Sequence, residues 1–304
     1  MHPWPNNMTF LQRGWLSSNH LLLTHPDETV LIDSGYVSHA EQTRSLIAHA
    51  LQDRPLDRLI NTHLHSDHCG GNAMLQSVYP HMQTGIAPGL ADAVSKWDEA
   101  RLTYAPTGQD CPRFTFQHII RPGHELRIAG ETWQVHPAPG HDPHAVILFQ
   151  PDSGVLVSAD ALWEHGFGVV FPEIEGEDGF TGIAQSLDLI ESLQPRWVVP
   201  GHGDMFTDVE SALQRARARL EGFQSSPAKH ASHAAKVLLK FKLLDWQRID
   251  RDALMLWAEE CHFLHLLHQR YYPVHDLTEW VELLMQDLVK AQVARQDGKD
   301  WLNA

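Results

Sequence analysis

Short apolar runs alternate with longer amphipathic segments along the chain from residue 9 to residue 204. The apolar runs have the length of β-strands and lie at residues 21–24, 29–32, 56–62, 145–149, 155–158 and 196–199. Apolar positions three or four residues apart predict helices that begin near Ser38, Thr181 and Asp208. Strands and helices that alternate in this way are typical of a layered α/β domain, which is the fold class that we expect.

The pattern changes near Pro227, where the polar stretch Gln224-Ser-Ser precedes a region that has helical periodicity alone. The expected helices of this region cover residues 230–244, 250–270 and 276–296. We therefore expect two parts, an α/β domain over residues 1–226 and a small all-helical module over residues 227–304.

Composition and charge narrow the class of protein. The chain has 304 residues, of which 43% are hydrophobic and 20% charged, as in ordinary soluble globular proteins. The formal net charge of −15 argues against nucleic acid or an anionic membrane as the main partner, since both require a basic face. No run of about 18 apolar residues predicts a membrane-spanning helix, and the amino terminus lacks the pattern of a signal peptide. The three cysteines are too few for a disulfide framework, so we expect reduced thiols and a cytoplasmic protein.

A cluster of potential metal ligands follows the apolar run at 56–62. The segment is His63-Leu-His65-Ser-Asp67-His68, and the turn Gly70-Gly71 comes directly after it. Imidazole and carboxylate groups together suit zinc, iron or manganese. A single histidine is more often a hydrogen-bonded or solvated residue, but four ligands within six residues at a strand end indicate a metal site.

Three residues downstream complete this candidate site. His141 precedes the apolar run at 145–149, Asp160 follows the run at 155–158, and His202 follows the run at 196–199. The two histidines each adjoin glycine, which allows the backbone to turn sharply and aim the side chain. The set now contains five histidines and two aspartates, too many for one tetrahedral ion. Two ions that share one carboxylate would use all seven, so the sequence predicts a dinuclear site.

The order His-x-His-x-Asp-His, then His, then Asp, then Gly-His-Gly resembles the metallo-β-lactamase-fold hydrolase superfamily. The upstream segment Val30-Leu-Ile-Asp33-Ser-Gly35 is similar to the strand and turn that precede the metal motif in that superfamily. The resemblance covers residues 10–204. It implies an αββα sandwich, with two sheets face to face, helices outside them and metals at one edge, and it makes residues 1–226 the catalytic domain.

The resemblance also assigns the ligands to two groups that share one carboxylate, and zinc is then the expected metal, with iron and manganese as alternatives. The ligands would be His63, His65 and His141 for the first ion, Asp67, His68 and His202 for the second, and Asp160 as the bridge. Asp33 would orient the ligating imidazoles from behind.

Asp160 also narrows the choice within the superfamily, because true β-lactamases generally lack an aspartate at the bridging position. The chain resembles instead glyoxalase II, quorum-signal lactonases and related thioester hydrolases. The segments that carry His144 and Trp163 are closer to the quinolone-biosynthesis thioesterase branch. The implied reaction is the attack of hydroxide, held by the metals, on the carbonyl of a small thioester, lactone or ester, with Asp67 able to relay a proton to the leaving group.

Several alternatives stay open. The same fold supports persulfide dioxygenases that use a single iron, and it supports non-catalytic relatives that bind a ligand. His144 and His165 are candidates for contact with substrate or for support of the ligands. A loop role is equally consistent with the position of His144, and the position of His165 favours the surface. The carboxyl-terminal aromatic residues would pack within the helical module or form a lid over the metals. The expected partner is a small-molecule substrate, and a second copy of the chain in a homodimer is a further candidate.

Overall fold

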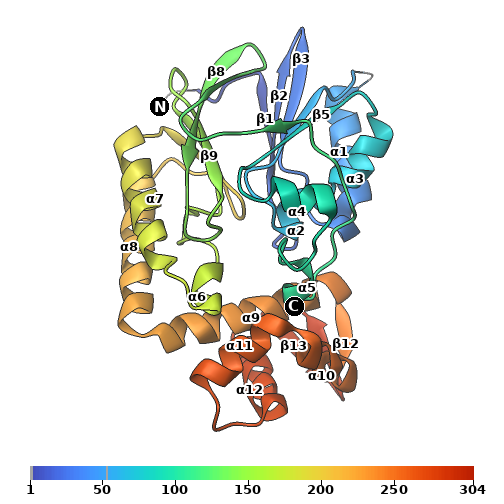
Figure 1. Ribbon diagram of the computed structural model, residues 1–304, viewed down its shortest axis with the longest axis vertical. Coiled ribbons are helices and arrows are strands. Elements are labelled where there is room, and N and C mark those ends of the chain that lie inside the picture. The colour runs from blue at the N-terminus through green and yellow to red at the C-terminus, as the bar shows by residue number, and fades with distance from the viewer. Residues whose placement is uncertain (1–2, 53) are drawn as a thin grey trace.

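Two β-sheets lie face to face in the amino-terminal part of the molecule, and helices cover their outer faces (Figure 1). The structure, a computed structural model, describes residues 3–52 and 54–304. The first sheet has six strands in the order β1-β2-β3-β4-β5-β6. These are β1 (Met8–Leu11), β2 (His20–His25), β3 (Glu28–Ile32), β4 (Arg58–Ile60), β5 (Gln83–Ile86) and β6 (His118–Ile119). The first three strands pair antiparallel and the last four pair parallel.

The second sheet has five strands in the order β11-β10-β9-β8-β7, of which β10 and β11 are parallel and the others antiparallel. They are β7 (Glu125–Ile128), β8 (Glu131–Pro137), β9 (Val146–Gln150), β10 (Val155–Ala159) and β11 (Trp197–Pro200). The longer flanking helices are α1 (Ala40–Leu51), α3 (Asn72–Val78), α7 (Phe180–Leu193) and α8 (Val209–Ser225).

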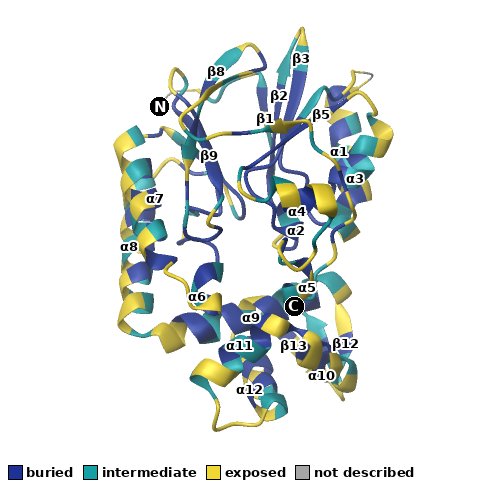
Figure 2. Cartoon of the chain, viewed as in Figure 1, coloured by how far each residue is buried: buried dark blue, intermediate teal, exposed yellow. Residues whose placement is uncertain are grey.

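Apolar side chains alternate between two layers along the central strands. Leu21 and Leu23 of β2 belong to the core between the sheets, whereas Leu22 packs in the layer with residues of α1 and α3. Strands of the second sheet likewise contribute to the central core and to the layer with α7 and α8. Strands that are buried on both faces carry near-continuous apolar residues (Figure 2), which is why the sequence shows them as apolar runs. The layers confirm the expected αββα sandwich.

The expected helix starts are only partly confirmed. At Asp208 the carboxylate accepts a hydrogen bond from the backbone N–H of Ser211 at 3.2 Å and caps α8. At Ser38, by contrast, a 3₁₀ turn precedes α1, and no side-chain cap forms. The reason is that the carboxylate of Glu41 bonds Arg44 on the same helix and does not reach back to cap the helix start. Short helices in the connections are η1 (Val37–His39), α2 (Ser66–Cys69), α4 (Ala91–Lys96), α5 (Tyr104–Thr107) and α6 (Phe171–Glu175).

The carboxyl-terminal region corrects the expectation of an all-helical module. Besides its helices it contains a three-stranded antiparallel sheet in the order β12-β14-β13. Its strands have three or four residues, most of them polar, so no apolar run reveals them in the sequence. The elements of this region are α9 (Pro227–Trp246), β12 (Arg248–Asp250), α10 (Arg251–Glu260), α11 (His262–Tyr271), α12 (Leu277–Lys290), β13 (Ala294–Asp297) and β14 (Asp300–Asn303).

The connection between the two parts is short. Helix α8 ends at Ser225 and α9 begins at Pro227, which is where the sequence predicts a boundary. The division of the chain into two domains stays a prediction. The helix expected over 250–270 is divided at Cys261 into α10 and α11. No helix in residues 3–52 and 54–304 is both long enough and apolar enough to cross a membrane.

Candidate metal centre

The loops that follow β4, β8, β10 and β11 meet at one edge of the sandwich, on the side that faces α9 (Figure 1). They bring together all seven side chains that the sequence identifies as candidate ligands. The seven form two groups, His63, His65 and His141 in one and Asp67, His68, Asp160 and His202 in the other, and within each group one ligand atom per residue lies within 4.8 Å of the rest.

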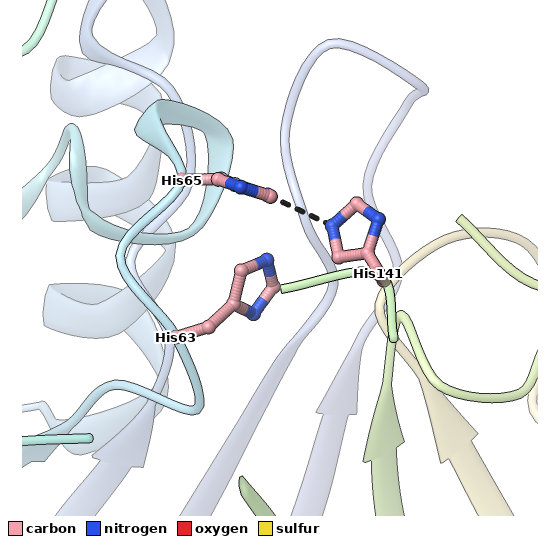
Figure 3. A group of neighbouring side chains, drawn as sticks. All are labelled: His63, His65 and His141. Carbon is pink, nitrogen blue, oxygen red and sulfur yellow. Dashed lines mark hydrogen bonds between the residues drawn. The ribbon is translucent and has the colours of Figure 1, made fainter. Parts of the chain in front are cut away.

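The three histidines of the first group converge from two loops (Figure 3). His65 Nδ1 lies 2.8 Å from His141 Nε2. The opposite nitrogen of His141, Nδ1, donates to the carbonyl oxygen of Val169 at 2.6 Å, which leaves the lone pair of Nε2 directed at the group. His63 Nδ1 lies 3.1 Å from the hydroxyl of Thr62, and its Nε2 is buried with no hydrogen-bond partner in the described part of the chain. Coordination would satisfy that buried nitrogen.

The second group combines two imidazoles and two carboxylates. His202 Nε2 lies 3.0 Å from Asp67 Oδ2, and His68 Nε2 lies 3.4 Å from Asp160 Oδ1. The other oxygen of Asp160, Oδ2, lies 3.3 Å from Nε2 of His141 in the first group. Asp160 therefore presents one carboxylate oxygen to each group, as a bridging ligand would.

Asp33 lies behind both groups and belongs to neither. Its Oδ2 accepts from His68 Nδ1 at 2.8 Å and from the Thr62 hydroxyl at 2.8 Å, and its Oδ1 accepts from the backbone N–H of Thr62 at 2.9 Å. Since the Thr62 hydroxyl donates to Asp33, it is free to accept from Nδ1 of His63. One carboxylate thus directs Nε2 of a histidine in each group toward the site. Asp33 holds this position with a left-handed backbone, φ 58°.

Two tryptophans that the sequence analysis did not assign to the site lie against the second group. The indole N–H of Trp163 donates to Asp160 Oδ1 at 3.2 Å, and its ring meets the His202 ring edge to face at 5.4 Å. Trp15 stacks on His202, with ring centroids 5.5 Å apart and planes 6° apart, and it also meets the Trp163 ring edge to face at 5.4 Å. In the sequence, Trp163 could have been identified as a neighbour of the site by its position three residues after Asp160. Trp15 could not, because it reaches the site only through tertiary packing.

Glycine is required at two positions beside the ligands. A Cβ atom at Gly201 would lie 2.0 Å from Asp160 Oδ1, and one at Gly168 would lie 2.4 Å from His141 Nδ1. Such distances are far below van der Waals contact, so any side chain there would displace the ligand.

The electrostatics of the site give most of the candidate ligands the protonation states that coordination needs. His68 is the exception: burial would lower its pKa, but the carboxylates of Asp33, Asp160 and Asp67 outweigh burial and raise that pKa well above normal. Burial lowers the pKa of His63 well below its usual value and lowers the pKa of His65 to about 4. Burial alone would raise the pKa of Asp160, but the charges of His68 and its neighbours outweigh it and lower that pKa well below normal. Neutral imidazoles and ionised carboxylates are the forms that coordinate cations, so the donor set fits divalent metal ions.

Of the two further candidates, His144 and His165, one lines the cavity beside the site. His165 is exposed and lies at the rim of the cavity described below. His144 packs its ring over Gly89 and does not line that cavity. Asp142, which was not among the predicted site residues, is buried with Oδ2 3.7 Å from His65 Nε2. The signal for Asp142 was its place directly after His141.

A cavity of about 680 Å³ opens from the two groups toward the carboxyl-terminal region. His65, Asp160 and His202 line one side, and residues of α9 that include Val237 and Phe241 line the other. The aromatic residues weighed above as a lid do not line it: Trp257 and Phe263 are buried in the carboxyl-terminal core, and Tyr271 and Tyr272 pack against that core. Helix α9 forms the wall instead.

Fold and site together define a class: αββα sandwich proteins with a histidine–aspartate cluster between the ends of two sheets. Residues 13–202 match the Lactamase_B family model, which describes the metallo-beta-lactamase superfamily. The chain belongs to this superfamily, whose fold binds divalent metal ions.

Curated relatives are similar over only part of their length. A hydroxyacylglutathione hydrolase from Synechococcus sp. (strain JA-3-3Ab) is 29% identical over 164 residues, which are 54% of this chain and 57% of that protein. An atrochrysone carboxyl ACP thioesterase from Aspergillus fumigatus is 26% identical over 200 residues, 65% of this chain and 54% of that protein. The chain thus spans little more than half the length of these two relatives.

Solved structures share the fold. A metallo-beta-lactamase family protein from Thermus thermophilus superposes with a TM-score of 0.58 and 18% identity over 99% of both chains, the carboxyl-terminal region included. TTHA1623, solved in a di-iron-bound form, superposes with a TM-score of 0.53 and 26% identity over 68% of this chain and 98% of that one.

Proposed function

We propose that the protein is a hydrolase that binds two divalent metal ions and cleaves a small thioester, ester or lactone. The observation that carries the proposal is the position of Asp160, which offers one oxygen to each of two ligand groups. Relatives named as a hydroxyacylglutathione hydrolase and an ACP thioesterase support the choice of a thioester.

In this proposal His63, His65 and His141 would hold one ion, Asp67, His68 and His202 would hold the other, and Asp160 would be their shared ligand. When bound, the ions supply a nucleophile at neutral pH, because coordination lowers the pKa of water, and they polarise the substrate carbonyl. Zinc is the first candidate, and iron and manganese use the same donor types. The di-iron form of TTHA1623 supports iron as an alternative.

The residues of the chain orient the ligands and pack around them. The carbonyl of Val169 and the carboxylate of Asp33 hold protons on the outer nitrogens of His141 and His68, so that the inner nitrogens stay directed at the site. Phe171 packs its ring against those of His65 and His141, with ring centroids 4.7 and 5.5 Å apart. Asp67, with Oδ2 3.0 Å from His202 Nε2, is the proposed relay for a proton to the leaving group. Thiolates leave with little protonation, which suits a site without a second acid.

The test combines metal analysis with a substrate panel. The protein, loaded in turn with zinc, iron or manganese, is assayed on acyl-CoA, acyl-glutathione and acyl-homoserine lactone, with Asp160→Ala as the inactive comparison. We expect two metal ions per chain and turnover of one substrate class that the variant loses. One iron per chain with oxygen consumption on a glutathione persulfide would replace the proposal with a dioxygenase. Two bound metals without turnover on any substrate would favour a non-catalytic relative.

A further inference from the structure

The wall of the cavity that α8 and α9 form carries basic side chains that take no part in the metal centre. Arg219 of α8 and His233 and Lys236 of α9 line the cavity together. The chain as a whole has a net charge of −15, so the presence of the two cationic groups among them, Arg219 and Lys236, is not a consequence of composition.

Arg219 has unused capacity for hydrogen bonds. Of its five N–H donors, one approaches the carbonyl oxygen of Phe167, at 3.4 Å. Burial lowers the pKa of Arg219, and no carboxylate in the described part of the chain offsets that cost. A half-buried guanidinium without an anionic partner is unfavourable, and an anion in the cavity would relieve it.

The neighbouring basic groups reinforce this property. The pKa of His233 is lowered to about 4, first by burial and then by the charges of Arg219 and of other basic neighbours that include Lys236. The electrostatic potential of the wall at His233 is therefore positive. Lys236 Nζ reaches Asp287 Oδ2 at 3.4 Å but remains partly exposed and able to bind a second anion. Lys240 differs, because its ammonium already donates to Asn303 and to the Val293 carbonyl.

The remaining wall is apolar, and the acidic groups lie elsewhere. Leu238, Phe241 and Leu244 of α9 line the cavity. The carboxylates that face it belong to the metal centre or to the loops beside it, such as Asp204 two residues after His202. The cavity therefore joins a metal centre, an apolar surface and a cationic wall.

We propose that the substrate carries an anionic group, a carboxylate or a phosphate, that Arg219 and Lys236 bind while an apolar stretch of the substrate packs against α9. This inference rests on the proposed hydrolase activity for its reaction, and it adds the class of substrate. Charge-assisted hydrogen bonds to one anion contribute about 1.5–3 kcal/mol each, which corresponds to roughly tenfold or more in affinity.

Binding is measured first, with the metal-loaded full chain and without any reaction. The probes are octanesulfonate and octyl methyl sulfone, which share the chain and the sulfonyl group and differ in charge, and neither is a strong metal ligand. We expect calorimetry to show octanesulfonate bound about tenfold more tightly than the sulfone. Arg219→Gln should remove most of this preference, and Lys236→Gln part of it.

The matched control is Arg217→Gln on the same helix. Arg217 pairs with Asp188 and Glu191 outside the cavity, so its loss should leave the preference intact. Equal binding of the two probes, or equal effects of the variants at 217 and 219, would overturn the anion site.

Turnover then identifies the anion. One substrate pair is the S-phenyl monothioester of hexanedioic acid and its methyl ester, and the other is acetyl-4′-phosphopantetheine and acetylpantetheine. In one of the pairs we expect the charged member to have the lower KM, with kcat little changed and the difference lost in Arg219→Gln. That pair identifies the anion as a carboxylate or a phosphate. Turnover of both pairs without any preference for charge overturns the inference alone. Absence of turnover of these four thioesters and of the whole panel under Proposed function, with the sulfonate preference retained, overturns the hydrolase proposal alone.

Discussion

The two sides of the cavity are built on different principles. On the sandwich side, the candidate ligands are braced by buried hydrogen bonds, such as the three that Asp33 accepts. On the side of α8 and α9, the basic groups are half-buried and Arg219 has a single weak contact. In the proposed hydrolase, the reaction chemistry would depend on the rigid arrangement within the sandwich, whereas the choice of substrate would depend on the helical wall and its unused donors.

The largest expected effect follows from breaking the shared ligand. Asp160→Asn keeps the shape of the side chain but removes its charge, so bridging is lost. We expect kcat/KM to fall by about 1,000-fold or more, on the order of 4 kcal/mol, and metal content to fall from two ions toward one. Steady-state kinetics and metal analysis check this. Glu164→Gln, a carboxylate that lines the same cavity outside both groups, should keep two ions. Two tightly bound ions in Asp160→Asn would contradict the bridging role.

A smaller effect tests the bracing behind the ligands. Asp33→Asn tolerates the left-handed backbone at this position but replaces the acceptor of His68 Nδ1 with a weaker one. We expect metal affinity to drop by about 10- to 100-fold, and the melting temperature of the loaded protein to fall.

Metal titration followed by calorimetry measures both effects. The matched control is Asp57→Asn, whose carboxylate also accepts from a threonine N–H and hydroxyl, those of Thr29, at 2.8 and 3.1 Å. It should lose stability without losing metal. Equal loss of metal in both variants would show that Asp33 acts on stability alone.

The contact between the helical region and the sandwich should weaken in acid. His230 of α9 accepts a hydrogen bond from the backbone N–H of Val170 on its Nε2 at 3.2 Å, which requires a neutral ring. Burial lowers the pKa of His230 to about 4, below the value near 6.5 that an unfolded chain has. Its stabilising contribution is therefore complete above pH 6.5 and is lost as the pH falls toward 4.

Chemical denaturation between pH 7 and 4.5 measures this loss. We expect the difference between the protein and its His230→Gln variant to shrink by about 2 kcal/mol over that range, since one pKa unit corresponds to about 1.4 kcal/mol. His262→Gln, at an exposed histidine of the same region, should follow the unmodified protein at every pH. A constant difference for His230→Gln would mean that this ring does not set the acid response.

The smallest expected effect concerns the indole that holds the bridging carboxylate. Trp163→Phe removes one hydrogen bond to Asp160 and keeps an aromatic ring beside His202. A loss of about 1 kcal/mol predicts a three- to tenfold lower kcat, with the KM for substrate little changed. Trp15→Phe, which lacks such a bond, should change kcat by less than about twofold. Equal effects would assign the role of Trp163 to packing.

The residue pattern predicted a layered α/β domain and the seven candidate ligands because both are recorded locally, and the resemblance to the superfamily added the sandwich and the assignment of the ligands to two groups. Apolar runs identify strands buried on both faces, and the ligands adjoin glycines or close a strand within a few residues. Trp15, Arg219 and the wall of α9 were missed, because their relation to the site exists only after distant segments pack. The three-stranded sheet was missed for another reason: its polar strands of three or four residues have no apolar period.

Gly201 limits which residues can replace it without disturbing the metal centre. Its hydrogen faces the carboxylate of Asp160 so closely that even one added methyl group would occupy the place of an oxygen. Even alanine, the smallest replacement for glycine, does not fit at this position. Gly201→Ala would therefore keep the outer surface, the cavity wall and all seven candidate ligand residues, but would displace the carboxylate of Asp160 from its place between the two groups. In a cell, such a variant would separate effects that need the intact metal centre from effects that need only the folded protein.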